Sequence, residues 1–193
     1  MAVADAWGRI VRWLSFYAPT TGSLLRSMAD REDVVILEQE IGTELPDALI
    51  EWWSVCGGTE QSAFAEVIPP FYTPHGPQAA LDAWRVQRKL WADTWDTPDC
   101  GVEAGSPGRS FHPLWVPFAF DGLGDALVID LRPGELRGCV LEWDHELSQA
   151  REPEWTSIGE MLDQVATALE ERSKVRHSFP ETTTDGRLDW RTN

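Results

Sequence analysis

Cysteine is scarce in this chain of 193 residues, and the cysteines it has are isolated. Cys56, Cys100 and Cys139 lie far apart, at none of the short spacings typical of a zinc site. An odd number of scattered cysteines also argues against a disulfide framework and is typical of a reducing compartment. We therefore expect a cytoplasmic protein without disulfides.

Long hydrophobic runs are missing as well. No uninterrupted apolar stretch approaches the roughly 20 residues that a membrane-spanning helix needs. The N-terminus has no basic region followed by an apolar run, so we expect no signal peptide. These absences predict a soluble protein that does not bind membranes.

Basic residues are few. Lysine and arginine together number 16 against 32 aspartates and glutamates, which gives a net charge of −16. This balance disfavours nucleic-acid partners, because phosphate backbones are bound mainly by lysine and arginine. It favours a basic protein partner, although acidity also serves solubility alone, which is the simpler explanation. The sequence leaves the oligomeric state open.

Catalytic motifs are also absent. The chain has no GxSxG elbow, no phosphate-binding Gly-Lys-Ser/Thr loop and no GxGxxG. His145-Glu146 begins like a zinc-protease motif, but Gln149 stands where the second histidine ligand is needed. Cys100 and His112 could form a nucleophile–base pair, but a free thiol is the better interpretation. We expect no enzymatic activity, no metal and no cofactor.

The stretch from Trp115 to Glu146 contains the element around which the rest of the chain is arranged. Residues 115–120, 126–131 and 139–143 are apolar and rich in β-branched or aromatic residues, which is typical of strands. Residues 121–125 and 132–134 between them contain the glycine, aspartate and proline of tight turns. Strands joined by short turns are most simply antiparallel neighbours. We therefore predict a central three-strand meander over about residues 115–143.

Helical patterns surround this meander. Apolar residues at spacings of three and four predict helices over 5–17, 31–41, 46–57 and 78–91. Ser157 and Glu160 form a capping box for a final helix. The predicted fold class is α+β: a mostly antiparallel sheet covered by N-terminal helices and a C-terminal helix. We assign residues 1–176 to one domain and expect a disordered tail over 177–193, and the loop at 92–113 is either functional or mobile.

Two groups of side chains are candidates for a site. Asp121, Asp125 and Asp130 could bind a cation or act as paired carboxylates, but aspartates in such turns more often cap backbone amides. Trp143 lies between Glu142 and Asp144, a context in which it could be partly exposed. An exposed tryptophan beside carboxylates is a candidate for a protein interface, although ordinary packing is the more frequent role.

The chain resembles the SUKH superfamily, specifically its Smi/Knr-like family, over roughly residues 7–170. The resemblance rests on pieces in a fixed order. They are Trp7 to Pro19, Glu32-Asp33 with Leu37-Glu38 and Gly42, Leu45-Pro46 to Gly57-Gly58, Trp115-Val116-Pro117-Phe118-Ala119 with Asp121-Gly122 and Gly124-Asp125, and Ile129-Asp130 with Pro133-Gly134 and Gly138-Cys139-Val140. Two departures are Cys139, where the family commonly has glutamine, and the loop at 92–113, which is richer in tryptophan and proline than the resemblance leads us to expect.

This resemblance implies a non-catalytic α+β domain. Bacterial members of the family are generally immunity proteins that neutralise polymorphic toxins, many of them nucleases, and fungal relatives are regulatory scaffolds of cell-wall assembly and signalling. A basic toxin domain is therefore the expected partner. The expected partner-binding residues lie around the meander and its turns: Asp121, Asp125, Trp143, Asp144 and Glu146. The alternatives are a regulatory scaffold and an undetected hydrolase that uses Asp121 and Asp125.

Overall fold

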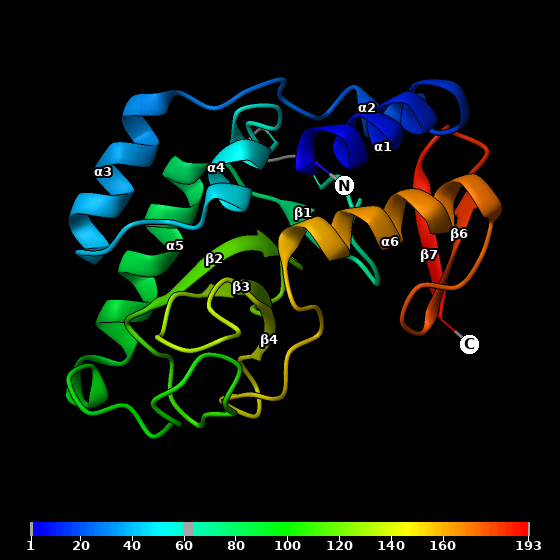
Figure 1. Cartoon of the computed structure of the whole chain (residues 1–193). Helices are drawn as coiled ribbons and strands as arrows, with labels where there is room; N and C mark the ends of the chain where they lie inside the picture. The colour runs from blue at the N-terminus through cyan, green and yellow to red at the C-terminus, as the bar shows by residue number, and fades with distance from the viewer. Residues whose placement is uncertain (1, 60–63, 193) are drawn as a thin grey trace.

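The computed structural model describes residues 2–59 and 64–192 (Figure 1). Within these residues, an antiparallel sheet of five strands in the order β1-β2-β3-β4-β5 packs with six α-helices. The α+β class is therefore confirmed. The strands of the sheet are β1 (Thr73–Pro74), β2 (Trp115–Phe120), β3 (Ala126–Asp130), β4 (Val140–Asp144) and β5 (Gln149–Ala150).

The predicted meander forms the centre of this sheet. Trp115 of β2 pairs with Asp130 of β3, and Ala126 of β3 pairs with Trp143 of β4, both in antiparallel register. The register shifts between Pro117 and Ala119. A shift fits this point of the strand, because proline has no amide to donate to the ladder.

Most helices begin and end close to the predicted positions, but the helix predicted over 46–57 ends at Trp53, and a short helix at Pro19–Gly22 was not predicted. The Asp30 side chain accepts from the Glu32 amide at 2.9 Å, Gly42 ends its helix at φ +80°, and Ser157 Oγ accepts from the Glu160 amide at 3.1 Å. The helices are α1 (Val3–Tyr17), α2 (Pro19–Gly22), α3 (Arg31–Ile41), α4 (Asp47–Trp53), α5 (Pro77–Leu90) and α6 (Ile158–Glu171), with a 3₁₀ turn at Ala92–Thr94.

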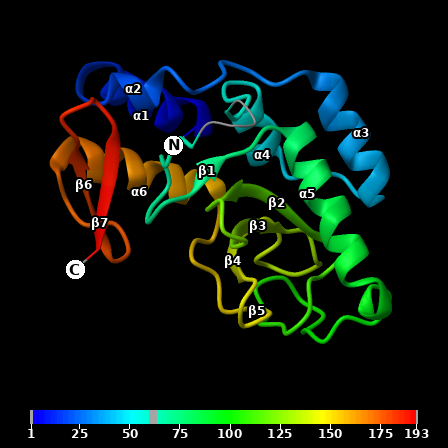
Figure 2. The same ribbon diagram turned by 180° about the vertical axis from the view of Figure 1, so that it is seen from behind.

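Helices and the long loop cover different parts of the sheet. On the helical side, Trp52 of α4 lies between Trp7 of α1 and Phe118 of β2, with ring centroids 5.6 and 5.5 Å apart. Figures 1 and 2 show α1 running beside α6 above the sheet. These edge-to-face aromatic contacts tie the helical layer to β2.

The segment at 92–113 covers the other part of the core. Phe111 contacts the rings of Trp115 and Trp143 at centroid distances of 5.6 and 5.4 Å, and Phe111 itself is fully buried. This segment therefore supplies core packing, a role that its lack of periodicity did not indicate.

The expectation of a disordered tail is wrong for residues 178–192. They form a hairpin of β6 (Ser178–Thr182) and β7 (Leu188–Thr192), which lies beside the ends of α1 and α6 (Figure 2). Trp190 is buried and donates from Nε1 to the Glu66 carbonyl at 3.0 Å, and the Leu188 amide donates to Thr21 Oγ1 at 2.9 Å. The short alternation of Leu188 and Trp190 with polar residues becomes stable because distant segments cover it; Asn193 lies outside the described residues.

Candidate functional site

The four predicted carboxylates lie in the turns at one end of the meander. Asp121 and Asp125 belong to the β2–β3 turn, Asp144 ends β4, and Glu146 follows in the β4–β5 turn. The His145 amide donates to Asp125 Oδ1 at 2.9 Å and joins the two turns. The acidic turn surface is defined here as these carboxylates together with the two leucines of the turns: Asp121, Leu123, Asp125, Asp144, Glu146 and Leu147.

Capping holds these carboxylates in place. Asp121 Oδ1 accepts from the amides of Leu123, Gly124 and Asp125 at 2.8, 2.9 and 3.0 Å. Asp144 Oδ1 likewise accepts from the Leu147 amide at 2.8 Å. The prediction that Asp121 caps its turn is confirmed, and the turn chemistry explains why aspartate stands there.

The side chain of His145 extends the link between the turns. Its Nδ1 lies 2.8 Å from Asp125 Oδ1, and this hydrogen bond, followed by the charge of Asp125, raises the pKa of His145 above its ordinary value. The imidazole lies against Gly124, where φ is +136° and an added Cβ would approach the ring to 2.5 Å. Glycine is therefore required at 124 both by the backbone conformation and by the histidine.

Apolar side chains project between the charges. Leu123 is 83% exposed and Leu147 is 60% exposed, while Glu146 is also exposed. Sequence reasoning selected the carboxylates but missed these leucines. Leu123 could have been found from the sequence. An apolar residue at the centre of an Asp/Gly turn is not needed for the turn conformation, which indicates another role. Exposed apolar groups beside fixed charges are typical of a surface that binds another protein.

Trp143 does not belong to this surface. The interpretation of Trp143 as a partly exposed interface residue is wrong and the alternative of ordinary packing is confirmed, because Trp143 is 1% exposed and packs against Phe111, Trp115 and Trp91. Side chains alternate along β4, so Glu142 and Asp144 point away from the face that carries Trp143. The segment at 92–113 then covers that face, which the local Glu-Trp-Asp context could not reveal.

Asp130 also lies apart from Asp121 and Asp125. It stands at the opposite end of β3, fully buried, with Arg132 Nη2 2.7 Å from its Oδ2. Asp130 therefore forms neither a cation site nor paired carboxylates with Asp121 and Asp125; it accepts from the Gly105 and Arg132 amides instead. Among the residues that the structure describes, no group of three or more His, Cys, Asp or Glu side chains is placed to hold a metal ion.

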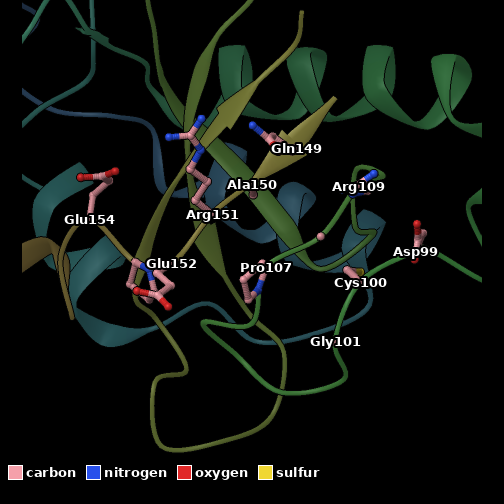
Figure 3. A pocket seen from close by; sticks show the side chains of 12 residues that line it. Asp99, Cys100, Gly101, Pro107, Arg109, Gln149, Ala150, Arg151, Glu152 and Glu154 are labelled. Atoms are coloured by element: carbon pink, nitrogen blue, oxygen red, sulfur yellow. The ribbon is translucent and has the colours of Figure 1, made fainter. Parts of the chain in front are cut away.

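A groove of about 1020 Å³ lies between the loop at 99–109 and residues 149–154 (Figure 3). Gly108 and Ala150 exchange hydrogen bonds of 3.0 and 2.9 Å across it. In this antiparallel register Arg109 stands opposite Gln149, and Arg151 follows on the same face. In Figure 3 the side chains of Gln149 and Arg151 lie in the upper part of the view, and Arg109 lies at the right, above Cys100.

The hypothetical pair of Cys100 and His112 is not formed. Burial raises the pKa of the Cys100 thiol, so the protonated form is favoured. His112 Nδ1 instead accepts from the Leu114 amide at 3.0 Å, and burial followed by the charge of Arg132 lowers its pKa to about 4. Cys100 therefore remains an ordinary thiol in the groove of Figure 3.

Comparison with models of known protein families shows to which family the chain belongs. The profile of the SMI1 / KNR4 family (SUKH-1) matches residues 28–164. The chain belongs to the SMI1 / KNR4 family. The matched segment of this family contains the whole five-stranded sheet and the acidic turn surface, whereas α1 and the β6–β7 hairpin lie outside it. A comparison with curated protein sequences found no match.

No helix in residues 2–59 or 64–192 has the length and apolar character needed to cross a membrane.

Proposed function

We propose that this SMI1 / KNR4 family member is a non-enzymatic binding protein that neutralises a basic toxin domain, such as a nuclease, by direct contact. The observation that carries the proposal is the acidic turn surface. It combines fixed carboxylates with two exposed leucines on a protein whose net charge is −16. Family membership supports a binding role in general, and the charge of this surface supports a basic partner in particular.

The hydrogen bonds within the turns prepare the carboxylates for a partner. Among the described residues, the bonds to Asp121, Asp125 and Asp144 use Oδ1 alone. Their Oδ2 atoms are therefore left for the lysines and arginines of a partner. Because the turns already hold these side chains, little conformational entropy is lost when the partner binds. The negative charge of the acidic turn surface would also accelerate the encounter of the protein with a basic cleft on its partner.

The side chains considered for catalysis have structural roles that support a non-enzymatic function. Asp121 caps three amides, His112 accepts a backbone hydrogen bond, and the Cys100 thiol is favoured in its protonated form. An acidic inhibitor needs none of them as a nucleophile or base. It needs only to occupy the basic surface on which the toxin binds its own substrate.

The first test is capture of partners from the cells that make the protein. Tagged protein is used at low salt (about 50 mM) and high salt (about 500 mM), and bound proteins are identified by mass spectrometry. We expect one basic protein with a toxin-like domain that is lost at high salt. Cell-wall or kinase proteins would instead support a regulatory scaffold. A toxin whose binding is insensitive to salt would contradict the electrostatic mechanism.

A matched pair of charge reversals then locates the surface. Glu146→Lys places a cation within the acidic turn surface, whereas Glu135→Lys places one in the exposed turn at the opposite end of the meander. Calorimetry with the purified toxin domain should show about tenfold weaker binding for Glu146→Lys and little change for Glu135→Lys. Equal effects of the two substitutions would show that net charge matters and the surface does not.

A further inference from the structure

A second hollow lies between α3 and α4, in a part of the molecule that the proposed function does not use. Its volume is about 730 Å³, within the usual range of binding pockets. Val34 and Trp53, both buried, line it together with the exposed apolar side chains of Met28, Val35 and Ile50. This hollow is called the α3–α4 groove below.

The exposed residues of this groove converge from three segments. Met28 is 67% exposed, Val35 is 41% exposed and Ile50 is 36% exposed. A single exposed apolar side chain needs no explanation, but a concave apolar surface shared by three segments is typical of a binding site. The Ala29 amide donates to the Trp53 carbonyl at 2.9 Å, which holds the segment of Met28 beside α4.

The sequence of α3 explains why this surface is left uncovered. Leu37 is buried on the side of α3 that faces the core, while Val35, 100° away from Val34 around the helix, points elsewhere. Arg31, Val35 and Glu38 follow one another at spacings of four and three and all line the groove. Figures 1 and 2 show α3 at the margin of the molecule, where α5 is its neighbour on the inner side.

The groove lies in the most acidic part of the chain. Residues 30–54 contain eight aspartates and glutamates against one arginine, a net charge of −7 out of −16 for the whole protein. Asp30 and Glu38 line the groove directly. Two others have partners, since Glu40 pairs with Arg85 at 2.9 Å and Glu51 accepts from the Ala4 amide at 3.0 Å. The negative electrostatic potential of the remaining carboxylates attracts cations and repels a second acidic chain.

From this combination we infer that the α3–α4 groove binds a basic amphipathic helix of a partner protein. The apolar face of such a helix would fill the groove, and its lysines and arginines would face the surrounding carboxylates. Met28 suits this role because an unbranched thioether side chain adapts to different apolar surfaces. A second copy of this chain is disfavoured, because a symmetric dimer would bring two segments of charge −7 together. The inference does not depend on the toxin-binding proposal, which concerns other residues.

A designed peptide tests the inference with the full chain. The probe has roughly 18 residues of leucine and lysine, with the leucines on one helical face, and the control peptide has the same composition in scrambled order. We expect calorimetry to show binding of the amphipathic peptide at least about tenfold tighter than binding of the scrambled one. Equal affinities, or no binding even at low salt, would overturn the inference.

Paired variants assign the binding to the groove. Val35→Ser/Ile50→Ser removes two exposed apolar anchors without changing charge, and Val11→Ser/Leu90→Ser does the same at exposed positions of α1 and α5 that lie outside both the groove and the acidic turn surface. We expect the groove variant to bind the peptide about tenfold more weakly and the control variant to change it less than twofold. Met28→Ser, outside both helices, should weaken binding in the same direction while circular dichroism stays unchanged.

The remaining outcomes also decide the inference. Similar losses in both paired variants, or none in either, would show non-specific attraction and contradict a specific groove. A wild-type dimer in sedimentation that becomes a monomer in Val35→Ser/Ile50→Ser would identify a second copy as the occupant and overturn the choice of a basic helix. None of these results depends on whether a toxin is found.

Discussion

Arg132 and Asp130 form an ion pair in the interior of the protein. Arg132 Nη2 lies 2.7 Å from Asp130 Oδ2, and the two side chains are 1% and 0% exposed. The same carboxylate accepts from the Gly105 amide at 2.8 Å, and Arg132 donates to the carbonyls of Ser106 and Gly101. The guanidinium also lies over the Trp115 ring at 5.2 Å. This pair therefore fastens the segment at 92–113 to the sheet.

Removing one partner of this pair should be strongly destabilising. Arg132→Met leaves the buried Asp130 charge uncompensated, so we expect the free energy of unfolding to fall by about 3–5 kcal/mol in urea titrations. The double variant Asp130→Leu/Arg132→Met should lose clearly less than the sum of the two single variants. A loss below about 1 kcal/mol for Arg132→Met would contradict a role for the pair in holding the loop.

His112 should make the protein sensitive to acid. Its pKa is lowered to about 4, so the folded state binds fewer protons than the unfolded state, where the pKa is about 6.5. The contribution of neutral His112 to the free energy of unfolding is therefore fully present above about pH 6.5 and is lost as the pH drops toward 4. His112→Asn keeps an acceptor for the Leu114 amide, so urea titrations should show little change at pH 7 but a more stable variant at pH 4.5. Ser15→Ala, at an exposed position of α1 without a titratable group, is the control and should leave this pH dependence unchanged.

The contact between His145 and Asp125 should have the opposite pH dependence. The pKa of His145 is raised, so its contribution to stability is fully present below the unfolded pKa and is lost as the pH rises through the folded value. In Asp125→Asn the pKa of His145 should move down toward its ordinary value, measured by NMR titration of the imidazole protons. Glu135→Gln, far along the meander, should leave the titration unchanged; an unchanged titration in Asp125→Asn would show that the contact does not persist in solution.

The C-terminal hairpin should contribute to global stability through Trp190. Truncation of this buried side chain in Trp190→Ala should cost about 3–5 kcal/mol of unfolding free energy in urea titrations. Arg191→Ala, on the same strand but exposed, should change it by about 0.5 kcal/mol or less. If both variants matched the wild type, the hairpin would be detached from the domain in solution.

Local sequence signals were sufficient for most of the secondary structure. Asp30, Gly42 and Ser157 mark helix ends because capping involves only neighbouring residues. The Asp/Gly turn at 121–125 is equally local, so both the turn and the capping role of Asp121 could be predicted. The hairpin could not, because two short strands with only two buried apolar side chains, Leu188 and Trp190, are stable only when other segments cover them.

The sequence by itself determined the central meander and the longer helices of this protein, the end of the meander at which its carboxylates gather, and the acidity that favours a basic partner. Only the tertiary structure decided which side chains remain accessible. Trp143 is buried because Phe111, from a segment without periodicity, covers it, whereas Leu123, Val35 and Ile50 stay exposed because nothing described here packs over them. Burial depends on segments far apart in the chain, whereas strands, turns and caps are determined by residues a few positions apart.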